Sequence, residues 1–159
     1  MKGLFIFPVI LVLLFGTPAF ADFQKGMDAA NRGDYATALK EWKPLAEQGN
    51  AKAQFNLGAL YYAGQGVTKN YNAAAKWYKL AAEQGDADAQ YNLGLMYSKG
   101  RGLIKDYTLA HMWSNIAASQ GNKSAMNHRD IVENKMPPSQ IEKAQDLALE
   151  CVAKNYRDC

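Results

Sequence analysis

The chain has 159 residues, with 18 Lys and Arg against 15 Asp and Glu, a formal net charge of +3 at neutral pH. This excess is too small to indicate a nucleic-acid-binding protein. The length suits one domain of ordinary size, and the interspersed charges are typical of solvated helix faces.

The first 21 residues are typical of a secretory signal peptide. Lys2 supplies a positive charge, residues 4–15 are almost entirely apolar, and small residues precede a cleavage point between Ala21 and Asp22. We expect cleavage there, which leaves a domain at 22–159; an uncleaved N-terminal anchor is the alternative. The predicted location is the bacterial periplasm, or secretion, with no membrane association after cleavage.

Residues 23–48 form a divergent N-terminal unit. Its first helix is expected from Phe23 to about Ala30, and it is short enough to cap a stack. Its second helix aligns with later ones, except that Trp42 takes the place of Tyr78 instead of Trp77.

Two consecutive segments, 49–84 and 85–120, are copies of each other and are identical at 17 of 36 positions without a gap. A period of this length with helical patterning predicts stacked helix pairs. We therefore expect an all-α fold, an α/α superhelical solenoid of about eight helices in four antiparallel pairs. Such proteins usually work as binding surfaces.

Each full copy has the same expected helix boundaries. Gly58 and Gly94 lie inside the first helix, where a glycine usually permits close approach of another helix. The second helix is expected to start after Asn70, or Asp106 in the next copy, as the N-cap. Trp77 is expected on its inward face.

The C-terminal unit, 121–159, is degenerate. A capping box at 139–142 predicts a final helix running to about Lys154. Cys151 and Cys159 are the two cysteines of an exported chain, which favours one disulfide. A straight helix holds them about 12 Å apart, so the tail must turn back near Asn155; two free thiols are the alternative.

The repeated pattern AxAQxNLGxxYxxGxGVxxxYxxAxxWxxxAAxQG resembles the Sel1-like repeat, a longer-looped relative of the tetratricopeptide repeat. The resemblance covers residues 23–156. It implies an α/α superhelix and a role as an adaptor or scaffold. Some exported members carry a cysteine pair in every repeat and are associated with β-lactam binding, but neither full repeat of this chain contains cysteine.

No catalytic constellation is found in the sequence. The two histidines, His111 and His128, lack partners at zinc-ligand spacing, and the Gly-x-Gly loops lack the features of a phosphate-binding loop. We expect no enzyme activity, no metal and no cofactor. His111 is expected at the surface or half-buried.

The resemblance to tetratricopeptide-type superhelices implies that the first helices line a concave groove. Asn56, Asn92 and His128 recur every 36 residues there, and Asn amides can hold an extended peptide backbone; the alternative is that they serve local packing. The expected groove residues are Lys52, Phe55, Asn56, Ala59, Tyr62, Asp88, Tyr91, Asn92, Leu95, Ser98, Asn127 and His128.

Three functions agree with these features. The first is an exported adaptor that binds an unidentified protein or peptide. The second is a protein that binds or hydrolyses β-lactams or peptidoglycan. The third is a secreted effector or inhibitor of another protein. The partner and the oligomeric state do not follow from the sequence.

Overall fold

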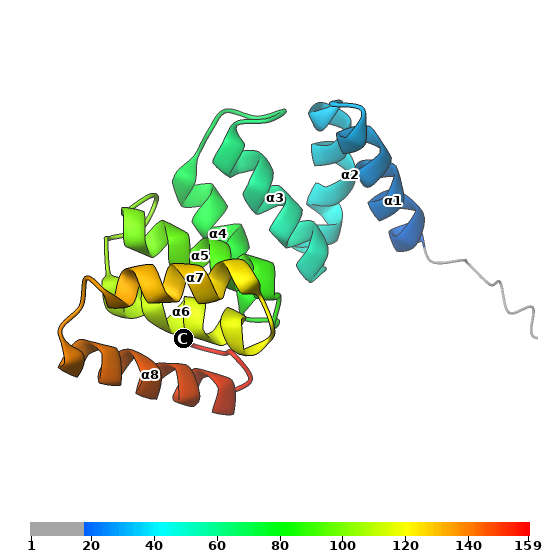
Figure 1. Cartoon of the computed structure of the whole chain (residues 1–159). Helices are drawn as coiled ribbons and strands as arrows, with labels where there is room; N and C mark the ends of the chain where they lie inside the picture. The colour runs from blue at the N-terminus through cyan, green and yellow to red at the C-terminus, as the bar shows by residue number, and fades with distance from the viewer. Residues whose placement is uncertain (1–17) are drawn as a thin grey trace, which may run out of the picture.

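The computed structural model describes residues 18–159, with side chains from residue 23 onward, and this part of the chain consists of helices joined by short loops (Figure 1). The predicted all-α solenoid is confirmed, with eight helices in the described residues. They are α1 (Pro18–Asn31), α2 (Tyr35–Glu47), α3 (Ala51–Ala63), α4 (Tyr71–Ala82), α5 (Ala87–Lys99), α6 (Tyr107–Ser119), α7 (Lys123–Glu133) and α8 (Pro138–Ala153).

Six helices begin at an Asp or Asn whose side-chain oxygen accepts the backbone N–H three residues on, at 2.8–3.1 Å. Such caps satisfy N–H groups that have no partner within the helix. The predicted caps Asn70 and Asp106 are confirmed. The capping box predicted at 139–142, with Ser139 as the N-cap, is wrong: α8 starts two residues earlier than that box implies, at Pro138, whose fixed φ suits the first helical position, and has no side-chain cap.

Glycines set the close crossing within each helix pair. A Cβ built on Gly58 would lie 2.6 Å from the Tyr78 ring, and one on Gly94 would lie 2.6 Å from Ser114 Oγ. Gly26 meets Trp42 in the same way. Trp42 therefore occupies the position of Tyr78, as the alignment predicted.

The inward position of α4 belongs to Tyr78, which is 3% exposed. Trp77, expected there, is only half-buried and packs against the apolar cluster of α1–α3. Neighbouring residues of a helix point about 100° apart, so when Tyr78 faces α3, Trp77 points instead toward the preceding α1/α2 unit.

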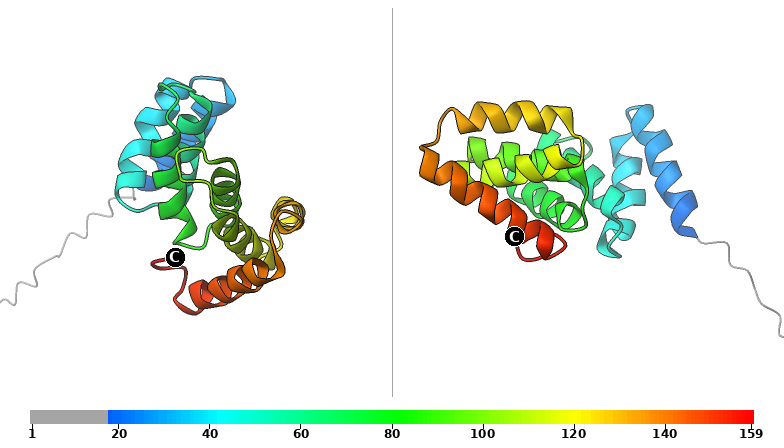
Figure 2. Two further views of the ribbon diagram at one scale, coloured as in Figure 1. Left: turned by 90° about the vertical axis from the view of Figure 1, so that its left-hand side faces the viewer. Right: turned by 60° about the horizontal axis from the view of Figure 1, so that its bottom comes forward.

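The last helix departs from the expected fourth pair. Helices α1/α2, α3/α4 and α5/α6 form pairs, and each second helix also contacts the next first helix. Helix α8, however, packs against α6, so that α6 lies between α7 and α8 (Figure 2, right). The Tyr156 ring then reaches back to Gly85, at the junction of α4 and α5.

Most of the predicted signal peptide, residues 1–17, lies outside the described residues. The predicted cleavage point between Ala21 and Asp22 falls within α1. Phe23 and Met27 of α1 pack against the buried apolar cluster of α1, α2 and α3. No helix in the described part of the chain is long and apolar enough to cross a membrane.

Candidate binding surface

The predicted groove residues of α3 and α5 occupy matching environments. Lys52 and Asp88 are exposed, and Asp88 accepts a hydrogen bond from Asn122 Nδ2 at 2.8 Å. The half-buried ring of Phe55 lies 5.8 Å from that of Tyr78.

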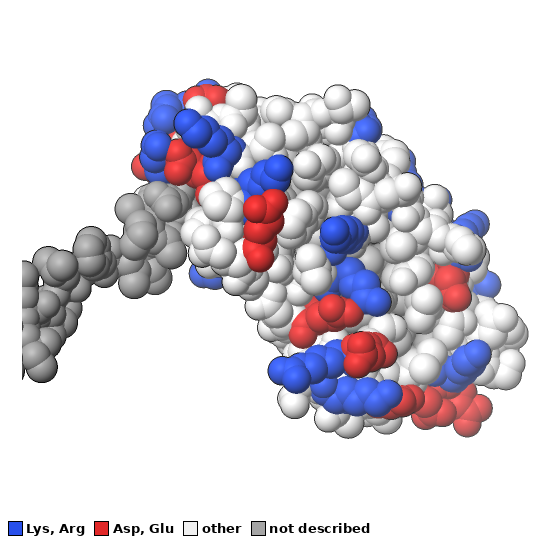
Figure 3. All heavy atoms as spheres, turned by 180° about the vertical axis from the view of Figure 1, so that it is seen from behind, with Lys and Arg blue, Asp and Glu red and all other residues white. Residues whose placement is uncertain are grey.

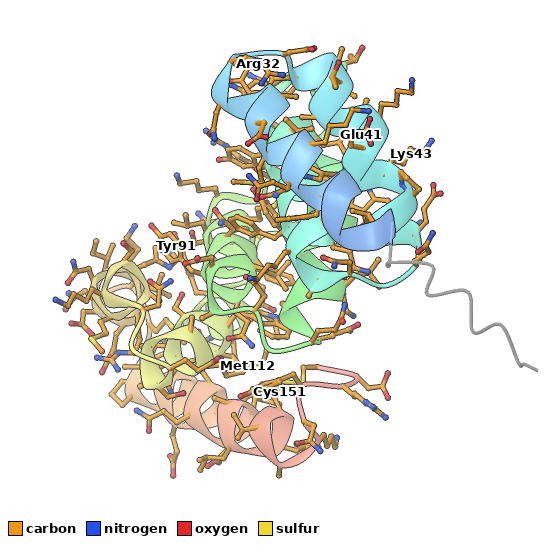
Figure 4. The ribbon with its side chains drawn as sticks, turned by 90° about the vertical axis from the view of Figure 1, so that its right-hand side faces the viewer. Arg32, Glu41, Lys43, Tyr91, Met112 and Cys151 are labelled. Atoms are coloured by element: carbon orange, nitrogen blue, oxygen red, sulfur yellow. A yellow bond between two sulfur atoms is a disulfide. The ribbon has the colours of Figure 1, made fainter. Side chains whose placement is uncertain are left out.

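Tyr91 occupies the same position in α5 as Phe55 in α3, and its ring faces α7 (Figure 4). Its centroid lies 6.1 Å from the His128 ring in an edge-on arrangement. The Phe55 ring packs beside that of Tyr78 and the Tyr91 ring beside that of His128, and both Phe55 and Tyr91 keep part of their surface open to solvent.

Asn56, Asn92 and His128 occupy equivalent positions on successive first helices, but their side chains have different hydrogen-bond partners. Asn56 Nδ2 lies 3.7 Å from Met27 Sδ of α1. Asn92 Nδ2 donates to its own helix, at Asp88 O, over 2.9 Å. The amide groups are half-buried in both cases.

His128 does not line an open groove, and the prediction that it does is wrong. It is 8% exposed, with Nε2 at 3.0 Å from Ser98 Oγ and Nδ1 at 2.8 Å from Ser114 Oγ. Burial lowers its pKa, and the charges of Lys99 and Lys135 lower that pKa further. Of the other predicted residues in this region, Ser98 is half-buried and Asn127 is exposed.

The hydroxyl of Tyr62 is already engaged. It accepts a hydrogen bond from Arg101, whose guanidinium lies over the rings of Tyr62 and Tyr71 at 5.7 and 5.5 Å. Tyr62 and Tyr71 meet edge to face at 5.2 Å. Arg101 thus belongs to the loop after α5 but packs on the preceding unit.

Sequence reasoning missed a pair of buried glutamines. Gln90 is fully buried, donates to Ala82 O at 3.1 Å and accepts from Gln120 Nε2 at 2.6 Å. Gln54 makes the matching bonds to Ala46 O and Gln84. Their recurrence every 36 residues, inside an apolar pattern, was the signal for a structural role.

His111 is fully buried, so the expectation that it is exposed or half-buried is wrong. Neither ring nitrogen makes a hydrogen bond, and Nε2 lies 3.5 Å from Glu133 Oε2. The pKa of His111 is lowered, mainly by burial, although Glu133 opposes that shift. The aligned Ala75 of α4 is buried as well.

The structure joins Cys151 and Cys159 as a disulfide with Cα atoms 5.5 Å apart. Asn155, Tyr156 and Asp158 have φ values of 52°, 65° and 54°, and these left-handed residues turn the tail back. Cys151 lies at the end of α8, beside the returning tail (Figure 4). Formation of the bond in the cell remains a prediction.

A small hollow and a larger open depression lie on the described residues. A hollow of 80 Å³ lies beside the disulfide, well below the roughly 300–1,000 Å³ of ordinary ligand pockets. A larger depression beside Gly102 and Ile104 is open to solvent. Residues 18–159 contain no group of three or more His, Cys, Asp or Glu side chains placed to hold a metal ion.

A family model described as the Sel1 repeat matches residues 51–86 and 87–122. The solved structure of a Sel1 repeat protein from Oxalobacter formigenes is 38% identical, with a TM-score of 0.64 over 70% of this chain and 87% of that chain. This chain belongs to the Sel1 repeat family. The Sel1 repeat fold supports a protein-interaction role in general.

Two longer proteins are also similar to this Sel1 repeat chain. A protective antigen present in uropathogenic Escherichia coli strains, displaying an SLR fold, is 30% identical with a TM-score of 0.81 over 87% of this chain. An uncharacterised protein of Neisseria meningitidis serogroup B is 57% identical over 35 residues. The Sel1 repeat chain spans 31% of the E. coli antigen and 8% of the Neisseria protein.

Proposed function

We propose that this protein is an exported Sel1 repeat adaptor that holds a segment of another protein against its first helices. The observation that carries the proposal is the matched pair Phe55 and Tyr91. Both rings remain partly open to solvent at equivalent positions of α3 and α5. Aromatic rings with an exposed face are favoured anchors in protein interfaces.

Polar groups beside these rings support binding of a peptide backbone. The Asn56 side chain makes a single hydrogen bond, to a sulfur atom, so its amide keeps donor and acceptor capacity. Lys52 and Asp88 add one exposed charge of each sign at equivalent positions. These groups suit a segment that carries both hydrogen-bonding and charged groups.

Export is supported by the signal-like first 21 residues and by the disulfide at the opposite end of the described chain. Similarity to a protective antigen of E. coli agrees with it. The proposal predicts that the mature protein starts at Asp22, which N-terminal sequencing of protein from the native periplasm tests.

Site-specific crosslinking tests the adaptor role. A photoreactive phenylalanine analogue replaces Lys52 or Asp88, which are exposed on the first helices, and Lys76, exposed on α4, serves as the control position. We expect a discrete adduct from the first two positions in the periplasm, and none from the third. Adducts from all three, or from none, would contradict the proposed surface.

A further inference from the structure

Basic residues collect on the loops that connect the first helix of each unit to its second helix. Lys69 and Lys105 are 36 residues apart, each directly before the N-cap of a second helix. These two, with the neighbouring cations of later loops, form what we call the basic edge. Its members are Lys69, Lys99, Arg101, Lys105 and Lys135.

Three lysines close to the C-terminal ends of α2, α4 and α8 each pair with a glutamate four residues away, whereas the cations of the basic edge make no such pair. Among the residues whose side chains the structure describes, 23–159, no carboxylate oxygen is found within 4.0 Å of a basic-edge nitrogen. The neutralised pairs are Lys43–Glu47, Lys79–Glu83 and Lys154–Glu150.

Tyrosine rings contact three of these cations, Arg101, Lys105 and Lys135, without cancelling their charge. Lys105 Nζ and Lys135 Nζ lie 4.7 and 5.8 Å from the centre of the Tyr107 ring, as Arg101 lies over Tyr62 and Tyr71. Such stacking positions a cation over a ring face. The pKa of Tyr107 is lowered, first by its hydrogen bond with Lys105, which agrees with a positive local potential.

The loops themselves are fitted together. Gly66 and Gly102 rest on the backbone of Tyr35 and Tyr71, so tightly that an added Cβ would overlap it. Each long loop therefore lies against the start of the preceding second helix. The loop that carries Arg101 and Lys105 thus lies against the start of α4, two residues from Lys69.

The carboxylates nearest in sequence are otherwise engaged. Asp106, next to Lys105, accepts the Leu109 N–H as a helix cap, and Glu133, two residues before Lys135, lies 3.5 Å from His111 Nε2. One apolar side chain, Ile104, stands 89% exposed beside Lys105. Seen from behind, the upper right edge of the molecule shows blue side chains without red ones beside them, while both signs are interspersed below (Figure 3).

We propose that the basic edge is a second binding surface, separate from the first-helix surface, which takes an extended acidic segment of another polypeptide. Loops on helices packed about 8–10 Å apart match acidic side chains three residues apart on one face of a polyproline-II-type extended chain, which has three residues per turn and advances about 3.1 Å per residue. A set of cations with a single protruding aliphatic residue fits such a segment. A lipid surface would be met by a broader apolar patch.

Poly-L-glutamate carrying a fluorescent label serves as the probe, with fluorescence anisotropy as the readout. Lys69→Gln/Lys105→Gln/Lys135→Gln removes three unpaired charges from the basic edge. Lys43→Gln/Lys79→Gln/Lys154→Gln removes the same number from the paired lysines and is the matched control. We expect affinity to fall about tenfold or more in the first variant and to stay within about twofold in the second.

Salt and competing polyanions complete the test. Wild-type binding should weaken as salt rises, and less steeply in the first variant, since fewer charges take part. Circular dichroism verifies that both variants remain helical. Equal loss in the two variants, no binding by wild type, or preferential binding to heparin or to phosphatidylglycerol vesicles would overturn the proposal.

Discussion

Nε2 of His111 lies 3.5 Å from Oε2 of Glu133, although the His111 residue has no exposed surface. This contact joins α6 to the end of α7. His128, on α7 itself, is held between Ser98 of α5 and Ser114 of α6. The two histidines of the chain thus both lie where α7 packs on the last full repeat.

The first prediction is that mild acid weakens this packing. Burial lowers the pKa of both histidines from the ordinary value of 6.5. The unfolded chain therefore binds these protons near pH 6.5, and the folded chain binds them only at lower pH. The free energy of unfolding should be greatest above pH 6.5 and decrease as the pH falls below it.

Urea unfolding between pH 7.5 and 5.5 measures this dependence. The comparison variant is His111→Ala/His128→Asn, which restores the residues found at the aligned positions Ala75 and Asn92. Its unfolding free energy should change less over this range than that of the wild type. If the unfolding free energies of the two proteins change equally with pH, the pH dependence does not come from these histidines.

The second prediction concerns the close crossing of α3 and α4. Gly58→Val places a side chain against the Tyr78 ring, 2.6 Å from the built Cβ, and should cost about 1–3 kcal/mol or more through overpacking. Ala63→Val, at an exposed position of the same helix, is the control. Thermal unfolding with a loss below about 0.5 kcal/mol, typical of surface positions, would show that the crossing is not tight. Gly94→Val should behave like Gly58→Val.

The third prediction is that Gln90 is needed for stability. Gln90→Leu removes the side-chain donor to Ala82 O, which still accepts the Gly85 N–H, and removes the acceptor of the exposed Gln120 amide; it should cost about 1–3 kcal/mol. Gln120→Ala leaves the buried Gln90 Oε1 without its donor and should cost a similar amount. Chemical denaturation measures both variants, and a loss below about 0.5 kcal/mol in both would show that the pair contributes nothing.

The fourth prediction separates binding from folding at the first helices. Asn56→Ala/Asn92→Ala should reduce the yield of the crosslinked adduct from position 52 while leaving the melting temperature nearly unchanged, since the two amides make few contacts. Asn72→Ala, exposed on α4, should change neither quantity. If the melting temperature and the adduct yield both decrease, the asparagines serve packing. If neither changes, Asn56 and Asn92 are not part of the proposed binding surface.

The fifth prediction is that exported protein carries the Cys151–Cys159 bond. Mass spectrometry after alkylation without reduction should find no alkylated thiol. Reduction should lower stability by about 2–3 kcal/mol on the chain-entropy model, because the tail that carries Tyr156 against Gly85 is released. Two alkylated cysteines, or a dimer that disappears on reduction, would contradict it.

The regular part of the fold could be predicted because each feature occurs twice. The caps Asn70 and Asp106 and the crossing glycines Gly58 and Gly94 repeat at the same spacing. Repetition distinguishes a structural position from a chance residue. It also identified the half-buried Asn56 and Asn92, though not what each contacts.

The predictions failed where the repeat ends. His128 keeps the spacing of Asn92 but is covered by the serines of the preceding helices, and only one copy of this arrangement exists. His111 is buried like the aligned Ala75, but only His111 has a carboxylate of α7, Glu133, beside it. The placement of α8 on α6 depends on packing among residues distant in sequence, which periodicity does not report.

The position of α8 constrains how such a chain can change in length. Because α8 packs on α6 and Tyr156 reaches the α4–α5 junction, the final segment spans two units. A duplicated 36-residue module inserted before residue 85 would leave these contacts intact. One inserted after residue 120 would separate α8 from the helix that it covers, so growth of the array is expected from its N-terminal side.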